Sequence, residues 1–222
     1  MGKIVYIVGD SGTGKSTAIR TLNPDETYII NVCNKDLPFR GSASKYKPKS
    51  EDTKGNLYMT NDHTKIIRAI EAIGANRPEI KTLIIDDFGF VITHQVFANV
   101  MIKGFDKFCL MAKSIQDIIE KIQEVRSDLY VFLMWHSDLK EDGTYKLKTT
   151  GKMIDNQIKP EGHAAIVLHT QIRDGNYKFL TQNDGIHIAK SPMGMFSEKL
   201  IDNDLQYVIE KMNQYYNEDV PQ

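Results

Sequence analysis

The sequence predicts an α/β fold built on a mostly parallel sheet, and three observations support this. Residues 3–8, 82–86 and 129–135 form short continuous apolar runs, as expected of strands buried on both faces of a parallel sheet. Residues 110–126 carry apolar side chains at helical spacing. A chain of 222 residues with 41% hydrophobic and 26% charged residues can bury one sizeable core. We therefore expect a single domain over residues 1–222.

The first apolar run leads directly into a glycine-rich loop of the form G-x-x-x-x-G-K-S, the Walker A phosphate loop. Glycines allow consecutive amides to turn towards an anion, and the helix expected over residues 16–22 adds its positive end. Lys15 is placed to reach the β and γ phosphates, and the Ser16 hydroxyl suits Mg²⁺. The sequence thus predicts ATP and Mg²⁺ as cofactors. The expected nucleotide-binding residues are Gly9, Asp10, Ser11, Gly12, Thr13, Gly14, Lys15, Ser16 and Thr17.

Two later strands end in polar residues that a nucleotide site needs. The apolar run before Asp86 and Asp87 is a Walker B pattern, in which Asp86 is the expected magnesium carboxylate. Asp87 either holds the hydrolytic water as a general base or caps the following turn. His136 follows the apolar run 129–135, where it either senses the γ phosphate or is a satisfied hydrogen-bonding group.

Between the phosphate loop and these aspartates, the pattern indicates a strand, a loop, a strand and a helix. Residues 27–32 and 57–60 are the expected strands. Residues 34–56 mix basic, acidic, small and proline residues, so we expect a long mobile loop that is either functional or merely solvated. Asn61 or Asp62 then caps a helix. Its apolar face carries Ile66, Ile67, Ile70 and Ile73.

The C-terminal half combines one clear helix with strands and polar connections. The structure of residues 88–108 is not evident from the pattern. Asp174-Gly175-Asn176 is a hairpin signal between two apolar runs. The expected elements are a helix to about residue 126, a strand at 129–135, a polar segment at 137–161, strands at 163–172 and 177–181, a last helix capped by Asp202 or Asn203, and a polar tail at 217–222.

Composition narrows the class of protein. A net charge of -1 provides no overall field for nucleic acid or membranes, so any DNA contact must be local. Cys33 and Cys109 form no C-x-x-C motif, which favours free thiols in a reducing compartment. No apolar run approaches a membrane span, and no histidine pattern suggests another metal. We expect a soluble, cytoplasmic protein without a membrane partner.

Four blocks together resemble one family: G-D-S-G-T-G-K-S, L-I-I-D-D-F, M-W-H-S-D and I-A-K-S-P-M-G-M-F, which span residues 9–196. The chain looks like the small RecA-like ATPases of bacteriophages, the core-only recombinase or single-strand annealing group. The resemblance implies a RecA-like three-layer α/β/α core with a mostly parallel sheet, to which the residue pattern adds a C-terminal β-hairpin and helix. It also implies that the strand ending in His136 lies between the phosphate-loop strand and the strand ending in Asp86.

The resemblance further implies assembly and DNA binding. RecA-like proteins form rings or filaments that hold ATP between protomers, and Lys190 is the candidate cation for a neighbour's site. The alternative is that Lys190 is only a surface lysine. The block I-A-K-S-P-M-G-M-F lacks arginine, and Pro192 stands where some relatives carry an arginine. Single-stranded DNA would meet residues 88–107 and 137–161, and a single-strand DNA-binding protein is a possible partner. The candidate DNA-binding residues are Tyr145, Lys146, Lys148, Lys152 and Lys159.

Some features leave alternatives open. Over residues 137–161 five lysines balance five acids, so a solvated loop rivals a DNA-binding one. RecA-type enzymes usually place a catalytic glutamate after the second core strand, and residues 30–36 contain none. Either Asp87 substitutes for it or hydrolysis is weak.

The expected function is a DNA-dependent ATPase that promotes annealing or homologous recombination. One alternative is a nucleotide kinase, which the six scattered arginines disfavour. A second is an AAA+ or packaging motor, and the single helix after residue 196 argues against the AAA+ type. A third is an interaction module that binds ATP without turnover.

Overall fold

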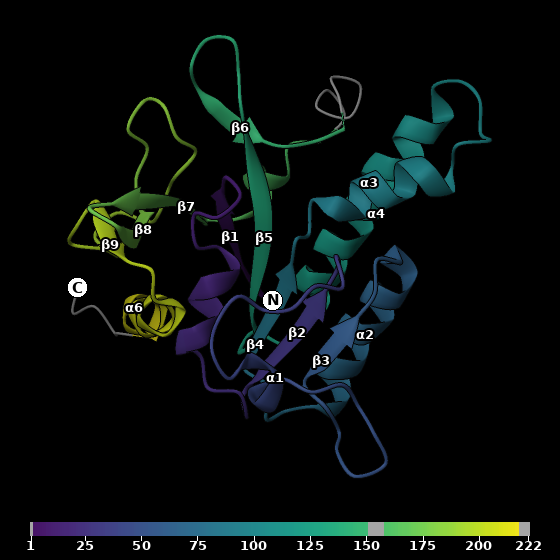
Figure 1. Cartoon of the computed structure of the whole chain (residues 1–222), viewed down its shortest axis with the longest axis horizontal. Helices are drawn as coiled ribbons and strands as arrows, with labels where there is room; N and C mark the ends of the chain where they lie inside the picture. The colour runs from purple at the N-terminus through teal and green to yellow at the C-terminus, as the bar shows by residue number, and fades with distance from the viewer. Residues whose placement is uncertain (1, 151–157, 218–222) are drawn as a thin grey trace.

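A sheet forms the centre of the molecule (Figure 1). The computed structural model describes residues 2–150 and 158–217, which contain nine strands. They are β1 (Lys3–Gly9), β2 (Thr27–Asn31), β3 (Leu57–Met59), β4 (Thr82–Asp86), β5 (Tyr130–Leu139), β6 (Tyr145–Leu147), β7 (Ile166–Arg173), β8 (Asn176–Leu180) and β9 (Leu200–Asp202).

The order along the sheet is β3-β2-β4-β5-β1-β7-β8-β9, with β6 paired to the end of β5. The pairs from β3 to β7 are parallel, whereas β8, β9 and β6 join antiparallel. The predicted α/β class is confirmed, and β5 lies between β1 and β4 as the resemblance implies. Gly9 pairs with His136, and Asn31 pairs with Asp86. The ends of β1, β2 and β4 and residue His136 of β5 therefore meet at one edge of the sheet.

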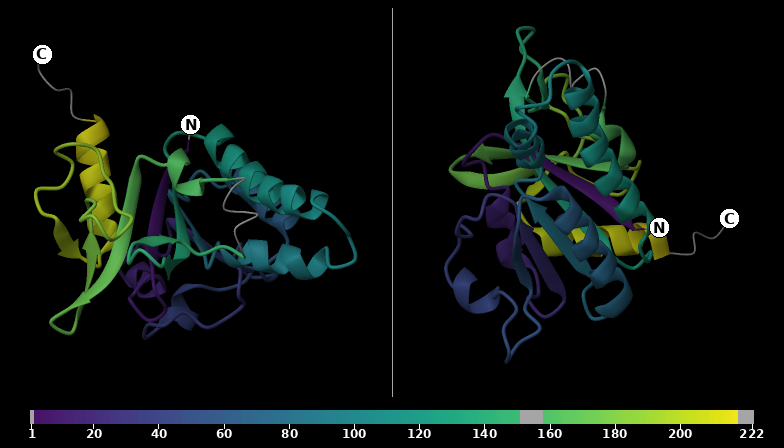
Figure 2. Two further views of the ribbon diagram at one scale, coloured as in Figure 1. Left: turned by 90° about the horizontal axis from the view of Figure 1, so that it is seen from above. Right: turned by 90° about the vertical axis from the view of Figure 1, so that its right-hand side faces the viewer.

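Helices cover both faces of the sheet, as Figure 2 shows for α2 to α4 on one side and α6 on the other. Alternation along β1 explains the two layers: Ile4, Tyr6 and Val8 pack with α2 and α4, whereas Val5 and Ile7 pack with η1 and α6. The helices are η1 (Ser16–Thr21), α1 (Ser42–Lys45), α2 (His63–Asn76), α3 (Phe90–Ala98), α4 (Asp106–Glu124), η2 (Pro160–His163) and α6 (Leu205–Asn217).

The structure corrects several expected elements. The helix after the phosphate loop is a six-residue 3-10 helix, so it contributes less of a helix dipole than expected. Residues 88–108 hold α3 and the start of α4, and β9 was not anticipated. His163 lies in η2 rather than in a strand. The polar tail lies outside the described residues except for Asn217.

The expected end of the strand at His136 is also wrong, because β5 continues to Leu139. Ser137 to Leu139 pair with β6, and Lys140 donates its amide to the Thr144 carbonyl at 2.8 Å. Gly143 has a positive φ of 80° in the connecting turn. The Asp142-Gly143 pair is thus a hairpin signal that the reading of residues 137–161 as a polar turn-rich segment overlooked.

The long segment after β2 is mostly exposed, but two buried side chains attach it to the core. Leu37 and Tyr46 are buried in the core on the face that carries α6, and α1 lies between them. No helix in the described part of the chain is long and apolar enough to cross a membrane.

Candidate nucleotide-binding site

The phosphate loop connects β1 to η1. At two of its positions, Gly9 and Gly14, other side chains lie so close to the backbone that only glycine fits. Gly14 has a φ of 101°, and a Cβ there would lie 2.9 Å from the Tyr177 ring. A Cβ on Gly9 would lie 1.9 Å from Thr170 Oγ1. Thr13 Oγ1 donates to the Asp10 carbonyl at 2.7 Å, and the Ser137 hydroxyl donates to the Asp10 carboxylate. The loop therefore lies against Ser137 of β5, Thr170 of β7 and Tyr177 of β8.

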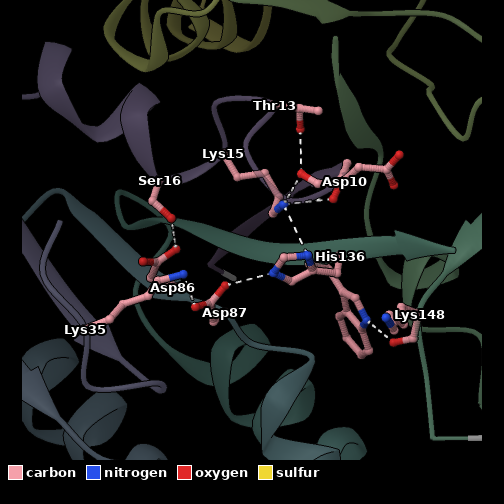
Figure 3. Close-up of polar contacts among 11 residues, drawn as sticks. Asp10, Thr13, Lys15, Ser16, Lys35, Asp86, Asp87, His136 and Lys148 are labelled. Carbon is pink, nitrogen blue, oxygen red and sulfur yellow. Dashed lines mark hydrogen bonds and ion pairs between the residues drawn. The ribbon is translucent and has the colours of Figure 1, made fainter. Parts of the chain in front are cut away.

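Lys15 lies within this loop and points along its inner side (Figure 3). Its Nζ donates to the carbonyls of Gly9 at 2.8 Å and Asp10 at 2.7 Å, and lies 3.5 Å from His136 Nδ1. Burial lowers the pKa of Lys15 to about 8, although the nearby Asp87 and Asp86 oppose this shift. The ammonium group therefore remains mostly charged at neutral pH, at the rim where a phosphate would bind.

Ser16 and Asp86 form a pair suited to a magnesium ion. Ser16 Oγ donates to Asp86 Oδ1 at 2.7 Å, whereas the fully buried Oδ2 of Asp86 has no hydrogen-bond partner among the described residues. Burial, helped by Asp87, raises the pKa of Asp86 to about 6. A buried carboxylate oxygen without a partner beside a hydroxyl fits Mg²⁺, which prefers oxygen ligands and takes few from the protein. No cluster of three His, Cys, Asp or Glu residues within the described ranges fits a different metal site.

Asp87 points into the same space from a left-handed backbone with a φ of 58°. Its carboxylate bonds to His136 Nε2 at 3.2 Å and forms an ion pair with Lys35. Burial would raise the pKa of Asp87, but the hydrogen bonds from His136 and Lys35 outweigh it and hold that pKa well below its usual range. The following helix α3 has no side-chain cap, so the alternative of a capping Asp87 is not what the structure shows.

His136 therefore lies between Lys15 and Asp87, with one ring nitrogen facing each (Figure 3). The ring of Phe90 packs on it edge to face at a centroid distance of 5.5 Å. Although β5 does not end at His136, the flanking parallel ladder does, because Gly9 is the last residue of β1 to pair with β5. This position makes His136 a direct link between the phosphate loop and the second acid.

These groups surround a pocket of about 290 Å³. Sequence reasoning anticipated the loop, Asp87 and His136 as its lining, but it missed Lys35, Asp36, Pro38 and Tyr177. Lys35 follows β2, whose end pairs with that of β4, and this sheet adjacency could not be read from the sequence. The lining residues are Ser11, Gly12, Gly14, Lys15, Ser16, Thr17, Lys35, Asp36, Pro38, Asp87, His136 and Tyr177.

Lys190 is separate from this pocket. Its backbone forms an antiparallel bridge with Val167 in β7, with N to O distances of 2.8 and 2.9 Å, and its side chain is exposed. The structure of one chain thus does not bring Lys190 to its own nucleotide site. Its suggested role in a neighbouring protomer stays a prediction.

The candidate DNA-binding residues lie on and after the β5–β6 ribbon. The Tyr145 ring stacks on His187 at a centroid distance of 4.9 Å, which occupies one of the two faces that a base could use. Lys148 and Lys159 are exposed, Lys146 is partly buried in β6, and Lys152 lies outside the described residues. Lys148 is bound through its backbone to β5: its amide donates to the His136 carbonyl at 2.8 Å.

Comparison with known proteins agrees with the fold. No protein-family model matches the sequence, and no curated protein sequence matches it significantly. Among solved structures, the chain is similar to a DnaB-like replicative helicase described with its interactions with primase, at a TM-score of 0.51 and 13% identity. The similarity covers 90% of this chain and 57% of the helicase chain. The chain therefore has an α/β fold similar to that of this helicase.

Proposed function

We propose that this protein binds and hydrolyses ATP and uses it to bind single-stranded DNA in annealing or homologous recombination, as in phage DNA metabolism. The observation that carries the proposal is that Lys15, Ser16 and the His136–Asp87 pair line one pocket, with the buried Asp86 hydrogen-bonded to Ser16. A glycine loop, a buried carboxylate with an unsatisfied oxygen and a second acid are the parts that phosphoryl transfer to water needs.

Each side chain has a chemical role in this proposal. Ser16 Oγ and Asp86 hold Mg²⁺, which when bound neutralises charge on the phosphate oxygens. Lys15 exchanges the carbonyls of Gly9 and Asp10 for phosphate oxygens. Asp87 orients a water molecule and accepts its proton at a carboxylate oxygen, while His136 holds that carboxylate in place. Because His136 also faces Lys15, it can report the state of the phosphate site to the β5–β6 ribbon.

Assembly and DNA binding complete the proposal. Lys190 would serve the site of a neighbouring protomer in a ring or filament, which its exposure and its distance from its own pocket permit. The ribbon and the segment after it would contact the DNA backbone through Lys148 and Lys159. A single-strand DNA-binding protein is a further proposed partner.

The test is ATP hydrolysis with and without single-stranded DNA for the parent, Lys15→Ala and a control, Lys65→Ala, which alters an exposed lysine on α2. We expect DNA to raise turnover in the parent and the control, and Lys15→Ala to abolish it. Turnover that ignores DNA but responds to a nucleoside monophosphate would instead identify a phosphotransferase. Nucleotide binding without turnover under any condition would indicate an interaction module.

A further inference from the structure

Lys35 is held at the nucleotide pocket by a turn with specific contacts. The buried Asn31, at the end of β2, donates its side-chain amide to the Lys35 carbonyl at 2.6 Å. Asn34 adopts a left-handed conformation with a φ of 53°, which asparagine tolerates better than most residues. Leu37, two residues after Lys35, is buried in the core. The turn between these anchors places the half-exposed Lys35 side chain at the lining of the pocket.

Few positively charged side chains line the pocket, and Lys35 is one of them. Lys15 and Lys35 are the two lysines that line the pocket within the described part of the chain, and its lining contains no arginine. Lys35 forms an ion pair with Asp87 and lies close enough to Asp86 to interact with it electrostatically. It is therefore on the side of the pocket that holds the acids, across from the glycine loop (Figure 3).

We propose that Lys35 is a second phosphate-binding cation, supplied by the same chain, which contacts the terminal phosphate of a bound nucleoside triphosphate. The inference rests on the proposed nucleotide site. A triphosphate bound along the glycine loop places its terminal phosphate beyond Lys15, towards the acids, where Lys35 lies. The side chain is 47% exposed, and its flexible stem lets the ammonium move from Asp87 to a phosphate oxygen.

This arrangement would let the protein distinguish a triphosphate from a diphosphate. A diphosphate reaches Lys15 but lacks the group that Lys35 contacts. The region after the second core strand is where a catalytic glutamate was expected, and a lysine there has the opposite charge and attracts the phosphate itself. Lys35 thus contributes to binding of the triphosphate, and Asp87 remains the candidate residue that orients and deprotonates the attacking water.

The experiment measures equilibrium binding of a non-hydrolysable ATP analogue and of ADP, each with Mg²⁺, to the parent, Lys35→Ala, Lys35→Arg and Lys45→Ala. Lys45 lies in the same segment, is exposed and does not line the pocket. We expect Lys35→Ala to weaken analogue binding about tenfold or more, as for the loss of one charge-assisted contact, and ADP binding by less than about twofold. Lys35→Arg should retain most of the preference, and Lys45→Ala should behave as the parent.

A purely structural Lys35 would act through Asp87 and give a different result. In that case Lys35→Ala would alter binding of both nucleotides to the same extent, and the effect would disappear in an Asp87→Asn background. We expect the loss of preference to persist in that background. An unchanged preference in Lys35→Ala, with binding that still needs Lys15, would overturn this inference alone. A parent that binds neither nucleotide would overturn the proposed function and the inference together.

Discussion

The two halves of β5 differ in the neighbouring strands with which they pair. Tyr130 to His136 are flanked by β1, and β4 lies on the other side up to Leu133, so almost all of these side chains are buried. Ser137 to Leu139 have β6 as their described partner, and Leu139 is 59% exposed. The first half ends at His136, which lines the nucleotide pocket, and the second half forms the ribbon next to the candidate DNA-binding lysines. His136 is held by the parallel ladder with β1, three residues beyond the last pairing of β5 with β4.

The two halves are nevertheless connected by direct contacts. Lys148 accepts a hydrogen bond at its carbonyl from Trp135 Nε1 at 2.7 Å, and donates its amide to His136. Movement of His136 in response to phosphate would therefore reach the start of the segment after β6. If the proposed function holds, we expect nucleotide binding to depend on few, strongly interacting groups and DNA binding to depend on many weak ones.

The largest effect is expected at Asp87. Asp87→Asn keeps the shape but removes the charge and the proton acceptor, so we expect ATP turnover to fall by about 10² to 10⁴-fold. Affinity for the magnesium-ATP analogue should change by no more than about threefold. The matched control is Asp36→Asn, since Asp36 lines the same pocket. Equal losses of turnover in both variants would show that Asp87 has no special role.

A second effect concerns the cluster that anchors the ribbon. His169 is buried, and its two ring nitrogens have no hydrogen-bond partner in the described structure; the rings of Tyr145 and His187 pack beside it. Burial, with a contribution from His187, lowers the pKa of His169 to about 4. The folded state therefore resists protonation, and its stability is lost as the pH falls from about 6.5 towards 4.

Urea denaturation at pH 7 and at pH 4.5 measures this loss. We expect His169 to contribute about 2 kcal/mol to the decrease in the free energy of unfolding. His169→Gln should show a correspondingly smaller decrease than the parent. The control His163→Gln, at an exposed position in η2, should match the parent. Identical pH dependence in all three proteins would contradict the account of this cluster.

A third effect isolates the magnesium pair. Ser16→Ala removes one of the proposed metal ligands, so we expect affinity for an ATP analogue in the presence of Mg²⁺ to fall about tenfold. With EDTA in place of Mg²⁺, the parent and the variant should bind the analogue equally well. A loss of the same size without the metal would mean that Ser16 acts on the nucleotide or on Asp86 alone.

The smallest effects are expected on the ribbon side. Lys148→Glu and Lys159→Glu should each weaken single-stranded DNA binding by a few fold and reduce the salt dependence by about 0.7 per phosphate contact. Nucleotide affinity should not change. Lys54→Glu, an exposed lysine in the segment after β2, is the control. Unaltered DNA binding in both ribbon variants would remove these lysines from the proposed interface.

The sequence predicted the parts of the site that depend on local pattern. A glycine loop after a strand and two acids after another identify themselves by residue type, and parallel strands bring their ends to one edge. Lys35 was missed because its position depends on β2 pairing with β4 and on the turn held by Asn31. The pairing of β2 with β4 joins residues more than 50 positions apart in the sequence, which no local pattern encodes.

The extension of β5 was missed for a related reason. Ser137 and Asp138 read as polar loop residues, yet an antiparallel ribbon outside the two-sided core tolerates them. The contact of Tyr145 with His187 was likewise not predictable, because residues 181–199 have no regular pattern that would place them beside β6. Sequence reasoning thus located the part of β5 that pairs with β1, and it missed the continuation that pairs with β6.

The most direct test is a crystal structure with a non-hydrolysable ATP analogue and Mg²⁺. The account predicts a metal ion bound by Ser16 Oγ and Asp86, with Lys15 Nζ moved from the carbonyls of Gly9 and Asp10 to the phosphates. Electron density for the nucleotide at another site, or Lys15 still bound to both carbonyls beside an occupied pocket, would contradict it.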